Sequence, residues 1–178
     1  MTHDQHFDLA RLGTFIEKVR EDPDAAQTVW RAETDWKQGL RSEATIRTHV
    51  IPMDEPQQLG GTDTAPNMVE VVLGAYGCCL TTGFVATAAM MGIELSDVRI
   101  GLEGDLDLRP FLGLASPHDV WPGFTSIRAT IRLDSPTASQ GELQKLYDAV
   151  VPTSPVGSIL SRPIELVTTL ATSSDAGT

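Results

Sequence analysis

Cysteine is scarce in this chain, where Cys78 and Cys79 are the only two among 178 residues. A chain of this length can bury a core large enough for independent stability, so it needs no disulfide framework, and a reducing cytoplasm fits. The four histidines are scattered, and no cluster of His, Cys, Asp and Glu has the spacing of a metal site. The sequence also lacks a nucleophile elbow, a phosphate-binding glycine loop and a dinucleotide fingerprint. We therefore predict neither a metal nor another cofactor.

Positive charge is also scarce. Lys and Arg number 13 against 24 Asp and Glu, which gives a net charge of -11. Such a chain repels phosphate backbones and anionic lipid surfaces, so we expect no nucleic-acid partner. The first eight residues are polar and no basic segment precedes an apolar one, so the sequence predicts no secretory signal and favours a cytoplasmic location.

Charge is absent altogether from Val71 to Met91. This segment is about long enough to span a bilayer, which is one interpretation. Its glycines and threonines, its acidic flanks at Glu70 and Glu94, and the absence of a flanking Lys or Arg favour the other interpretation, a buried central helix. We predict no membrane span.

Hydrophobic periodicity predicts the elements along the chain. Apolar residues recur at helical spacing over 9–19, and the pattern stops at Asp22-Pro23, where proline blocks a further helical turn. Alternation with period two over 30–37 and 40–47 predicts two strands, and Gln38-Gly39 supplies the turn of an antiparallel hairpin. The proline-rich stretch 52–66 is predicted to be a loop that leads into the long helix.

The second half of the chain follows the same logic. The long helix is predicted from Asn67 to about Met91 and ends at Gly92. Strands are predicted over 98–108, 127–133 and 164–170, and Ser139 caps a helix through Ala149. The predicted order is α-β-β-α-β-β-α-β, an α+β fold with antiparallel sheets. We expect a helical extension over 1–25, one domain over 26–170 and a disordered tail over 171–178.

Small residues recur every four positions along the long helix, at Ala75, Cys79, Gly83 and Thr87. Such a stripe allows another backbone to approach closely. It predicts helix-on-helix packing at the centre of the molecule, either within the chain or across a dimer axis.

The predicted loop 109–123 carries large apolar side chains among its prolines and glycines. A long loop of this composition normally packs over something, so it is a lid or part of a subunit contact. The candidate pocket-lining residues are Phe111, Leu112, Leu114 and Trp121.

The two cysteines have different predicted environments, because adjacent helical residues point about 100° apart and cannot easily form a disulfide with each other. Cys79 lies in the small-residue stripe, whereas Cys78 shares a face with Val71, Gly74 and Val85 and is expected in the core. A buried cysteine is often only a small hydrophobic residue, so Cys79 needs a further indication of reactivity.

A family resemblance supplies that indication. The segment GGTDTAPNMVEVVLGAYGCCL, Gly60 to Leu80, resembles the helix-entry segment of the OsmC/Ohr family of osmotically inducible and organic-hydroperoxide-resistance proteins. The segment TSPVGSIL, Thr153 to Leu160, resembles the family's second-cysteine loop. The resemblance extends over essentially everything after Trp30 and implies an intertwined homodimer, with antiparallel sheets wrapped around long central helices.

The resemblance also implies a chemistry. It suggests a cytoplasmic bacterial protein of the oxidative stress response, in which the Cys79 thiolate reduces an organic hydroperoxide and an arginine of the N-terminal hairpin stabilises that thiolate. Arg41 is the nearest match to that arginine, and its alternative interpretation is a solvated residue on the wet face of the strand.

Two positions depart from the family pattern. The family's arginine-holding glutamate aligns with Val69; the nearby Glu70 is a third catalytic candidate, or simply a helix-start carboxylate favoured by the helix dipole. The second, resolving cysteine is replaced by Ser154, which cannot form a disulfide. The resemblance is thus to a divergent subgroup that lacks the second cysteine.

Three hypotheses follow. In the first, the protein is a thiol-dependent peroxidase or redox sensor, and an external thiol, or Cys78 after distortion of the helix, resolves oxidised Cys79. In the second, it is a non-catalytic binding protein that holds an apolar small molecule such as a fatty acyl chain under the apolar loop. In the third, it is a structural or stress-associated protein without a small ligand.

Overall fold

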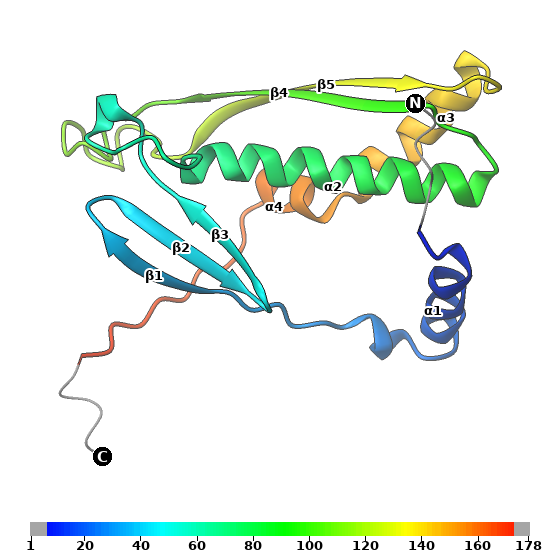
Figure 1. The fold of residues 1–178 in the computed structure, drawn as a ribbon, viewed down its shortest axis with the longest axis horizontal. Helices are drawn as coiled ribbons and strands as arrows, with labels where there is room; N and C mark the ends of the chain where they lie inside the picture. The colour runs from blue at the N-terminus through cyan, green and yellow to red at the C-terminus, as the bar shows by residue number, and fades with distance from the viewer. Residues whose placement is uncertain (1–6, 173–178) are drawn as a thin grey trace.

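The computed structural model describes residues 7–172 and shows an α+β fold around one long helix (Figure 1). The predicted tail from residue 173 onward lies outside the described residues. Short 3-10 helices occupy Pro23–Ala26, Gln57–Leu59 and Val151–Thr153. The main elements are α1 (Leu9–Glu21), β1 (Glu33–Gln38), β2 (Arg41–Ile46), β3 (His49–Met53), α2 (Met68–Met91), β4 (Asp97–Leu106), β5 (Phe124–Asp134), α3 (Gln140–Val150) and α4 (Pro155–Ser161).

The first sheet has three antiparallel strands in the order β1-β2-β3. The predicted hairpin is confirmed, and Gly39 adopts the left-handed conformation at its turn, with φ of 59°. The prediction that a loop begins at Pro52 was wrong, because Pro52 pairs with Glu43 inside β3. Since β3 lies at the edge of the sheet, the missing N–H of proline costs no ladder hydrogen bond there.

The second sheet is the long antiparallel pair of β4 and β5, which covers one side of α2. Both strands were predicted, to within a few residues at their ends. The ladder begins at the Asp97–Asp134 pair, and its register places Val98 opposite Leu133 and Ile100 opposite Ile131. These four apolar residues pack against the buried core.

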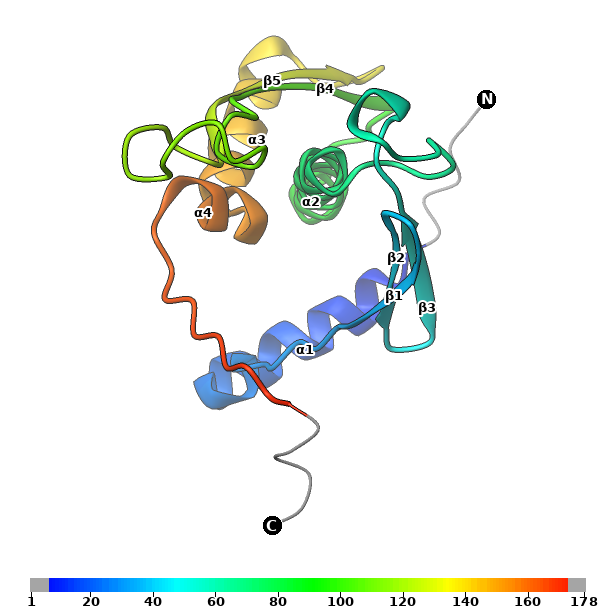
Figure 2. The same ribbon diagram turned by 90° about the vertical axis from the view of Figure 1, so that its left-hand side faces the viewer.

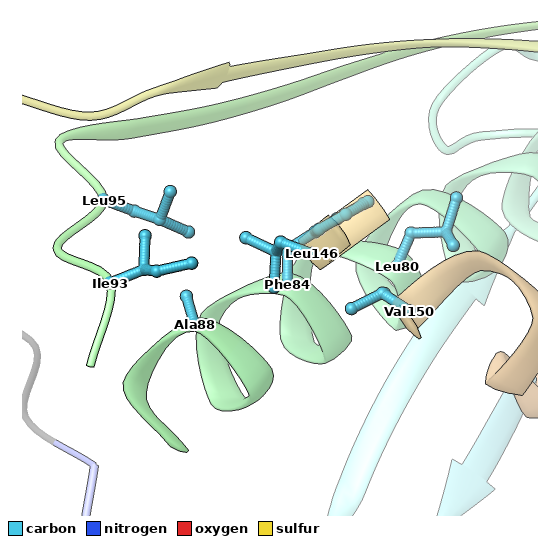
Figure 3. Close-up of a cluster of buried hydrophobic side chains, with 7 residues drawn as sticks. All are labelled: Leu80, Phe84, Ala88, Ile93, Leu95, Leu146 and Val150. Carbon is cyan, nitrogen blue, oxygen red and sulfur yellow. The ribbon is translucent and has the colours of Figure 1, made fainter. Parts of the chain in front are cut away.

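Helix α2 begins with a capping box, in which the Asn67 side chain accepts from the backbone N–H of Val69 and Glu70 accepts from the N–H of Asn67. It ends at Gly92, whose φ of 70° is the left-handed conformation that glycine adopts most readily. The core forms where α2, the turn after it and α3 meet (Figure 3). Its buried side chains are Leu80, Phe84, Ala88, Ile93, Leu95, Leu146 and Val150.

Two members of the small-residue stripe of α2 face other helices of the same chain: Gly83 lies against α3, and Cys79 lies against the start of α4. A Cβ on Gly83 would lie 2.8 Å from Val150 Cγ1, so only glycine allows the end of α3 to approach this closely. Helix α3 is capped by Ser139 as predicted. The predicted helix-on-helix packing is therefore present within the chain.

The end of the chain differs from the sequence prediction. The strand predicted over 164–170 was wrong, since this segment has no regular secondary structure and its residues are exposed. Helix α4, which was not predicted, lies just before it beside α2.

Much of the chain's apolar surface is exposed, because no other element of the same chain packs against it. Seen along α2, the strands β4 and β5 lie on one side, while α1 and the first sheet lie on the other (Figure 2). Of the residues in β1, β2 and β3, all of which the structure describes, Ala44 alone is buried. By length and composition α2 is the one helix of residues 7–172 that could cross a membrane, although a core helix meets the same criteria.

Candidate functional site

The candidate site is built around Cys79, which is half-buried in the middle of α2. The hydroxyl of Ser154 donates a hydrogen bond to Cys79 Sγ, with 3.3 Å between the oxygen and the sulfur. Ser154 Oγ in turn accepts from the backbone N–H of Gly157 at 3.1 Å. Because the oxygen accepts from Gly157, its single proton is free to point at the sulfur.

Local sequence explains why Ser154 is held there. Ser154 is the N-cap of α4, and Pro155 follows at the first helical position, where proline is favoured. Gly157 lets this turn pack closely, because a Cβ at that position would lie 3.0 Å from Tyr76 Cε2. The capping hydroxyl, which is buried, is thereby fixed against α2.

A pocket with a volume of about 560 Å³ is lined by Gly157, whose N–H donates to Ser154, while neither Cys79 nor Ser154 is among the described residues that line it. Aromatic rings form much of its wall, and none of the described residues that line it carries a charge. The lining residues are Tyr76, Trp121, Phe124, Thr125, Ser126, Ile127, Ala129, Ile131, Tyr147, Val151, Gly157, Ile159, Leu160 and Ser161. An uncharged organic molecule suits such a wall.

The predicted pocket-lining loop contributes only one side chain to this pocket. Trp121 lines it. Phe111, Leu112 and Leu114 do not line it and remain 68%, 51% and 72% exposed. The loop therefore does not close over the pocket in the single chain.

Cys78 does not lie in the core. Its side chain is exposed, on a face of α2 that it shares with the exposed Ala75 and Thr82. The expectation of a buried Cys78 was wrong because this face of the apolar helix is not covered by its own chain. The two cysteines thus have separate environments, as the 100° rotation between neighbours requires.

The other predicted site residues are not joined to Cys79. Arg41 is exposed at the start of β2 and forms no ion pair or hydrogen bond through its side chain with another residue of 7–172. Glu70 accepts from the N–H of Asn67 at 2.8 Å, so its carboxylate caps α2. Val69, which the sequence resemblance aligns with the family's glutamate, is exposed and donates its N–H to Asn67 Oδ1.

A buried polar cluster at the entry to α2 was missed from the sequence. Asp54 is fully buried, and its carboxylate accepts from the hydroxyls of Thr62 at 2.5 Å and Thr64 at 3.0 Å. Foremost the hydroxyl of Thr62, and then the N–H groups of Thr64 and Glu55, hold the pKa of Asp54 well below its usual range against the opposing effect of burial. The neighbouring Glu55 accepts from the side chain of Asn67.

This cluster ties the loop between β3 and α2 to the helix that carries Cys79. The loop closes tightly, since a Cβ on Gly61 would lie 1.8 Å from the carbonyl oxygen of Glu55. The sequence signal for this cluster was an Asp followed by Thr residues eight and ten positions later. It was missed because the whole stretch was predicted to be an irregular loop. No group of three His, Cys, Asp or Glu side chains among residues 7–172 is placed to hold a metal ion.

A family model described as OsmC-like protein matches residues 61–169, more than half of the chain. The chain belongs to the OsmC-like family. The resemblance identified from the sequence is therefore confirmed. Helix α1 and the first sheet lie outside the matched residues. No curated protein sequence matches the chain.

Solved structures of OsmC-like proteins share the fold. The OsmC-like protein of Mycoplasma pneumoniae has a TM-score of 0.64 at 16% identity, over 75% of this chain and 88% of that one. An organic hydroperoxide resistance protein of Legionella pneumophila has a TM-score of 0.54 at 17% identity, over 76% and 92%. One from Elizabethkingia anophelis has a TM-score of 0.54 at 13% identity, over 76% and 91%. At these identities the likeness shows the fold of OsmC-like proteins, and the chemistry has to be argued from the site.

Proposed function

We propose that the protein is a one-cysteine peroxidase of the cytoplasmic oxidative stress response, which reduces organic hydroperoxides through Cys79. The observation that carries this proposal is the hydrogen bond from Ser154 to Cys79 Sγ, together with the uncharged pocket that Gly157 lines. The hydroxyl holds the sulfur in place against the turn that carries Gly157, and the thiolate is the nucleophilic form of a cysteine. The family membership and the likeness to hydroperoxide resistance proteins support the same chemistry.

The first step is an attack of the Cys79 thiolate on the terminal oxygen of the hydroperoxide. A sulfur–oxygen bond forms and the oxygen–oxygen bond breaks, so Cys79 becomes a sulfenic acid and the hydroperoxide leaves as an alcohol after it takes up a proton. The sulfur is oxidised and the peroxide is reduced. Tyr76 and Trp121 in the pocket wall would hold the organic part of the substrate.

Regeneration needs an external thiol. The family resemblance aligns Ser154 with the second cysteine, and its hydroxyl, which contacts Cys79 Sγ, cannot form a disulfide. Cys78 is exposed on another face of the helix and cannot reach Cys79 without unwinding it. One thiol of an external reductant therefore displaces water from the sulfenic acid, and a second thiol then releases reduced Cys79 together with the oxidised reductant.

We further propose that the protein acts as a homodimer. The chain exposes 13654 Å², whereas a folded monomer of its mass would expose about 8,400 Å². The difference, roughly 5,000 Å² for one chain, is more than enough to supply an obligate dimer interface, which buries roughly 2,000–5,000 Å² over the two partners together. In this arrangement Arg41, which has no ion-pair partner among residues 7–172, is the proposed cation for the thiolate, and Glu70 is assigned to helix capping.

We also propose a division of the chain into three parts, based on its membership of the OsmC-like family. Residues 26–170 form the OsmC-like domain, and residues 1–25 form an extension that includes α1. Residues 171–178 remain the proposed tail.

The second candidate function, binding of an apolar small molecule without chemistry, is favoured by the pocket itself. It is large enough for an organic ligand, and no described residue that lines it carries a charge. This function would need no cation near Cys79 and no resolving cysteine.

The test is the rate at which purified protein consumes cumene hydroperoxide with dithiothreitol or a dihydrolipoyl donor. We expect turnover in the wild-type protein and in Cys78→Ser, and loss of turnover in Cys79→Ser. Cys78→Ser is a matched control because it makes the same atomic change one residue away on an exposed face.

Equal and negligible rates in all three proteins would reject the peroxidase. In that case native mass spectrometry of the wild-type protein, with a Tyr76→Ala variant for comparison, tests the binding function. A co-purified apolar molecule that is lost in Tyr76→Ala would support it.

A further inference from the structure

The pocket that Gly157 lines is polar but uncharged. Five of its lining residues carry a hydroxyl group, and Trp121 adds an indole N–H. The volume of about 560 Å³ lies within the roughly 300–1,000 Å³ of sites that hold small organic molecules. The wall therefore offers hydrogen bonds and apolar contacts but no counter-ion. The five hydroxyl-bearing residues are Tyr76, Thr125, Ser126, Tyr147 and Ser161.

The two tyrosines of the pocket have phenol groups that a ligand can use. Tyr76 comes from α2 and Tyr147 from α3, and neither phenol group forms a hydrogen bond with another residue of 7–172. Thr125 and Ser161, in contrast, donate their hydroxyl protons to backbone carbonyls. A phenol O–H can donate to a neutral oxygen such as that of an ester or a ketone.

No lysine or arginine of residues 7–172 lines the pocket. Arg128 and Arg132 lie on the face of β5 opposite to Ala129, which lines it, because side chains alternate along a strand. Arg128 also forms ion pairs with acidic side chains of β4. Arg162 follows the end of α4 and is likewise not a lining residue. At a net charge of -11 the chain as a whole also repels anions.

These features favour neutral substrates over anionic ones. A carboxylate that enters the pocket loses water and gains no cation, whereas an ester of the same shape keeps its hydrogen bonds without that cost. We propose that the pocket selects hydroperoxides whose organic part is uncharged and discriminates against those that carry a carboxylate, as fatty acid hydroperoxides do. The inference rests on the peroxidase proposed above and narrows its substrate class.

The test compares two hydroperoxides that differ in one charge. Both are cumene hydroperoxide with a substituent in the para position, which is a carboxylate in one compound and its methyl ester in the other. The peroxide group and the ring are the same, and the reaction of each compound with dithiothreitol alone corrects for intrinsic reactivity. We expect kcat/KM of the wild-type protein to be at least roughly tenfold higher for the ester than for the acid.

A lysine in the pocket wall should weaken this preference. Ala129→Lys adds an ammonium group at an exposed lining position, and it should raise kcat/KM for the acid at least roughly threefold. Thr130→Lys is the matched control, because it adds the same charge one residue along β5, at an exposed position on the opposite face and outside the pocket. It should leave the ratio of the two kcat/KM values unchanged.

Equal kcat/KM values for acid and ester, or a higher value for the acid, would overturn the inference, as would an equal gain for the acid in Thr130→Lys. Absence of any Cys79-dependent turnover would reject the peroxidase instead. In that case isothermal titration calorimetry with the two corresponding alcohols, which lack the reactive oxygen, decides the charge selection. Tighter binding of the ester supports it, and equal or tighter binding of the acid, or no binding of either, overturns it.

Discussion

Ser154 makes two hydrogen bonds with different roles, one within the first turn of α4 and one between α4 and α2. By accepting from Gly157 it caps α4, and by donating to Cys79 Sγ it joins α4 to the candidate nucleophile. One hydroxyl group therefore contributes both to the stability of a helix and to the position of the Cys79 sulfur. Substitutions at this residue separate the two contributions.

Ser154→Ala should affect both stability and reactivity. Loss of the cap should lower the free energy of unfolding by about 1 kcal/mol, and loss of the hydrogen bond to Cys79 Sγ should slow the reaction of Cys79 with cumene hydroperoxide roughly tenfold. Denaturant unfolding and single-turnover kinetics measure the two effects. Ser158→Ala, at an exposed position of the same helix, should change neither; an equal effect there would contradict the account.

Ser154→Cys should restore a resolving cysteine. Because Ser154 Oγ and Cys79 Sγ already lie 3.3 Å apart, a thiol at residue 154 should attack the sulfenic acid on Cys79 and form a disulfide. Peptide mass spectrometry after one equivalent of hydroperoxide should find the linked peptides containing residues 79 and 154. Absence of the link, with Cys79 oxidised, would show that the two side chains do not meet in solution.

At this scale the family resemblance singled out Cys79 and Ser154, whose side chains meet in the structure; the roles of both residues stay predictions. Cys78 was misplaced since an apolar helix gives no sign of which face its own chain leaves open. Asp54 was missed because burial of a carboxylate depends on Thr62 and Thr64, whose approach follows from the path of the loop and not from any periodic pattern.

At the scale of elements, the loop anchored by Asp54 holds the start of α2 and has a specific pH dependence. The folded-state pKa of Asp54 is below its usual range, and the unfolded value is about 3.9. Its stabilising contribution is therefore complete above about pH 5 and is lost as the pH falls through the unfolded pKa toward the folded one.

The measurement is the free energy of unfolding as a function of pH for the wild-type protein and Asp54→Asn. The variant should be less stable at pH 7, and the difference should shrink as the pH falls below about 4. Asp105, Asp107 and Glu142, whose pKa values are also lowered, are common to both proteins and cancel in the difference. A difference that is constant with pH would contradict the role of Asp54.

Long periodic elements were predictable and short ones were not. β4, β5 and α3 each turn a repeating set of apolar residues toward the core, which leaves a pattern in the sequence. α2 was predictable from its long uncharged run, which ends at Gly92. β3 was hidden by Pro52, because the rule that excludes proline from a strand does not hold at a sheet edge. α4 is a seven-residue helix with a glycine inside, although Ser154 and Pro155 were signals of its start.

The predicted strand over 164–170 failed for a different reason. Its alternating pattern is real, but a strand needs a neighbour for its backbone hydrogen bonds, and the segment pairs with no strand of residues 7–172. Leu166, Val167 and Leu170 are at least 80% exposed. Such a segment is expected where another chain supplies the cover.

At the scale of the whole molecule, the exposed surface predicts self-association. We expect a homodimer at micromolar concentration, with each chain burying well over the roughly 800 Å² per partner of a standard interface. Light scattering during size-exclusion chromatography gives the mass directly. A mass equal to the 19.2 kDa of one chain would contradict the prediction.

The measurement that tests the central claim most directly is the oxidation state of each cysteine after a brief exposure to cumene hydroperoxide, with a sulfenic-acid trap present. The account predicts that Cys79 gains one oxygen atom and is trapped at near-stoichiometric yield, while the exposed Cys78 stays reduced. Oxidation of Cys78 in preference to Cys79, or no oxidation of either, would show that Ser154 and the pocket do not make Cys79 the reactive thiol.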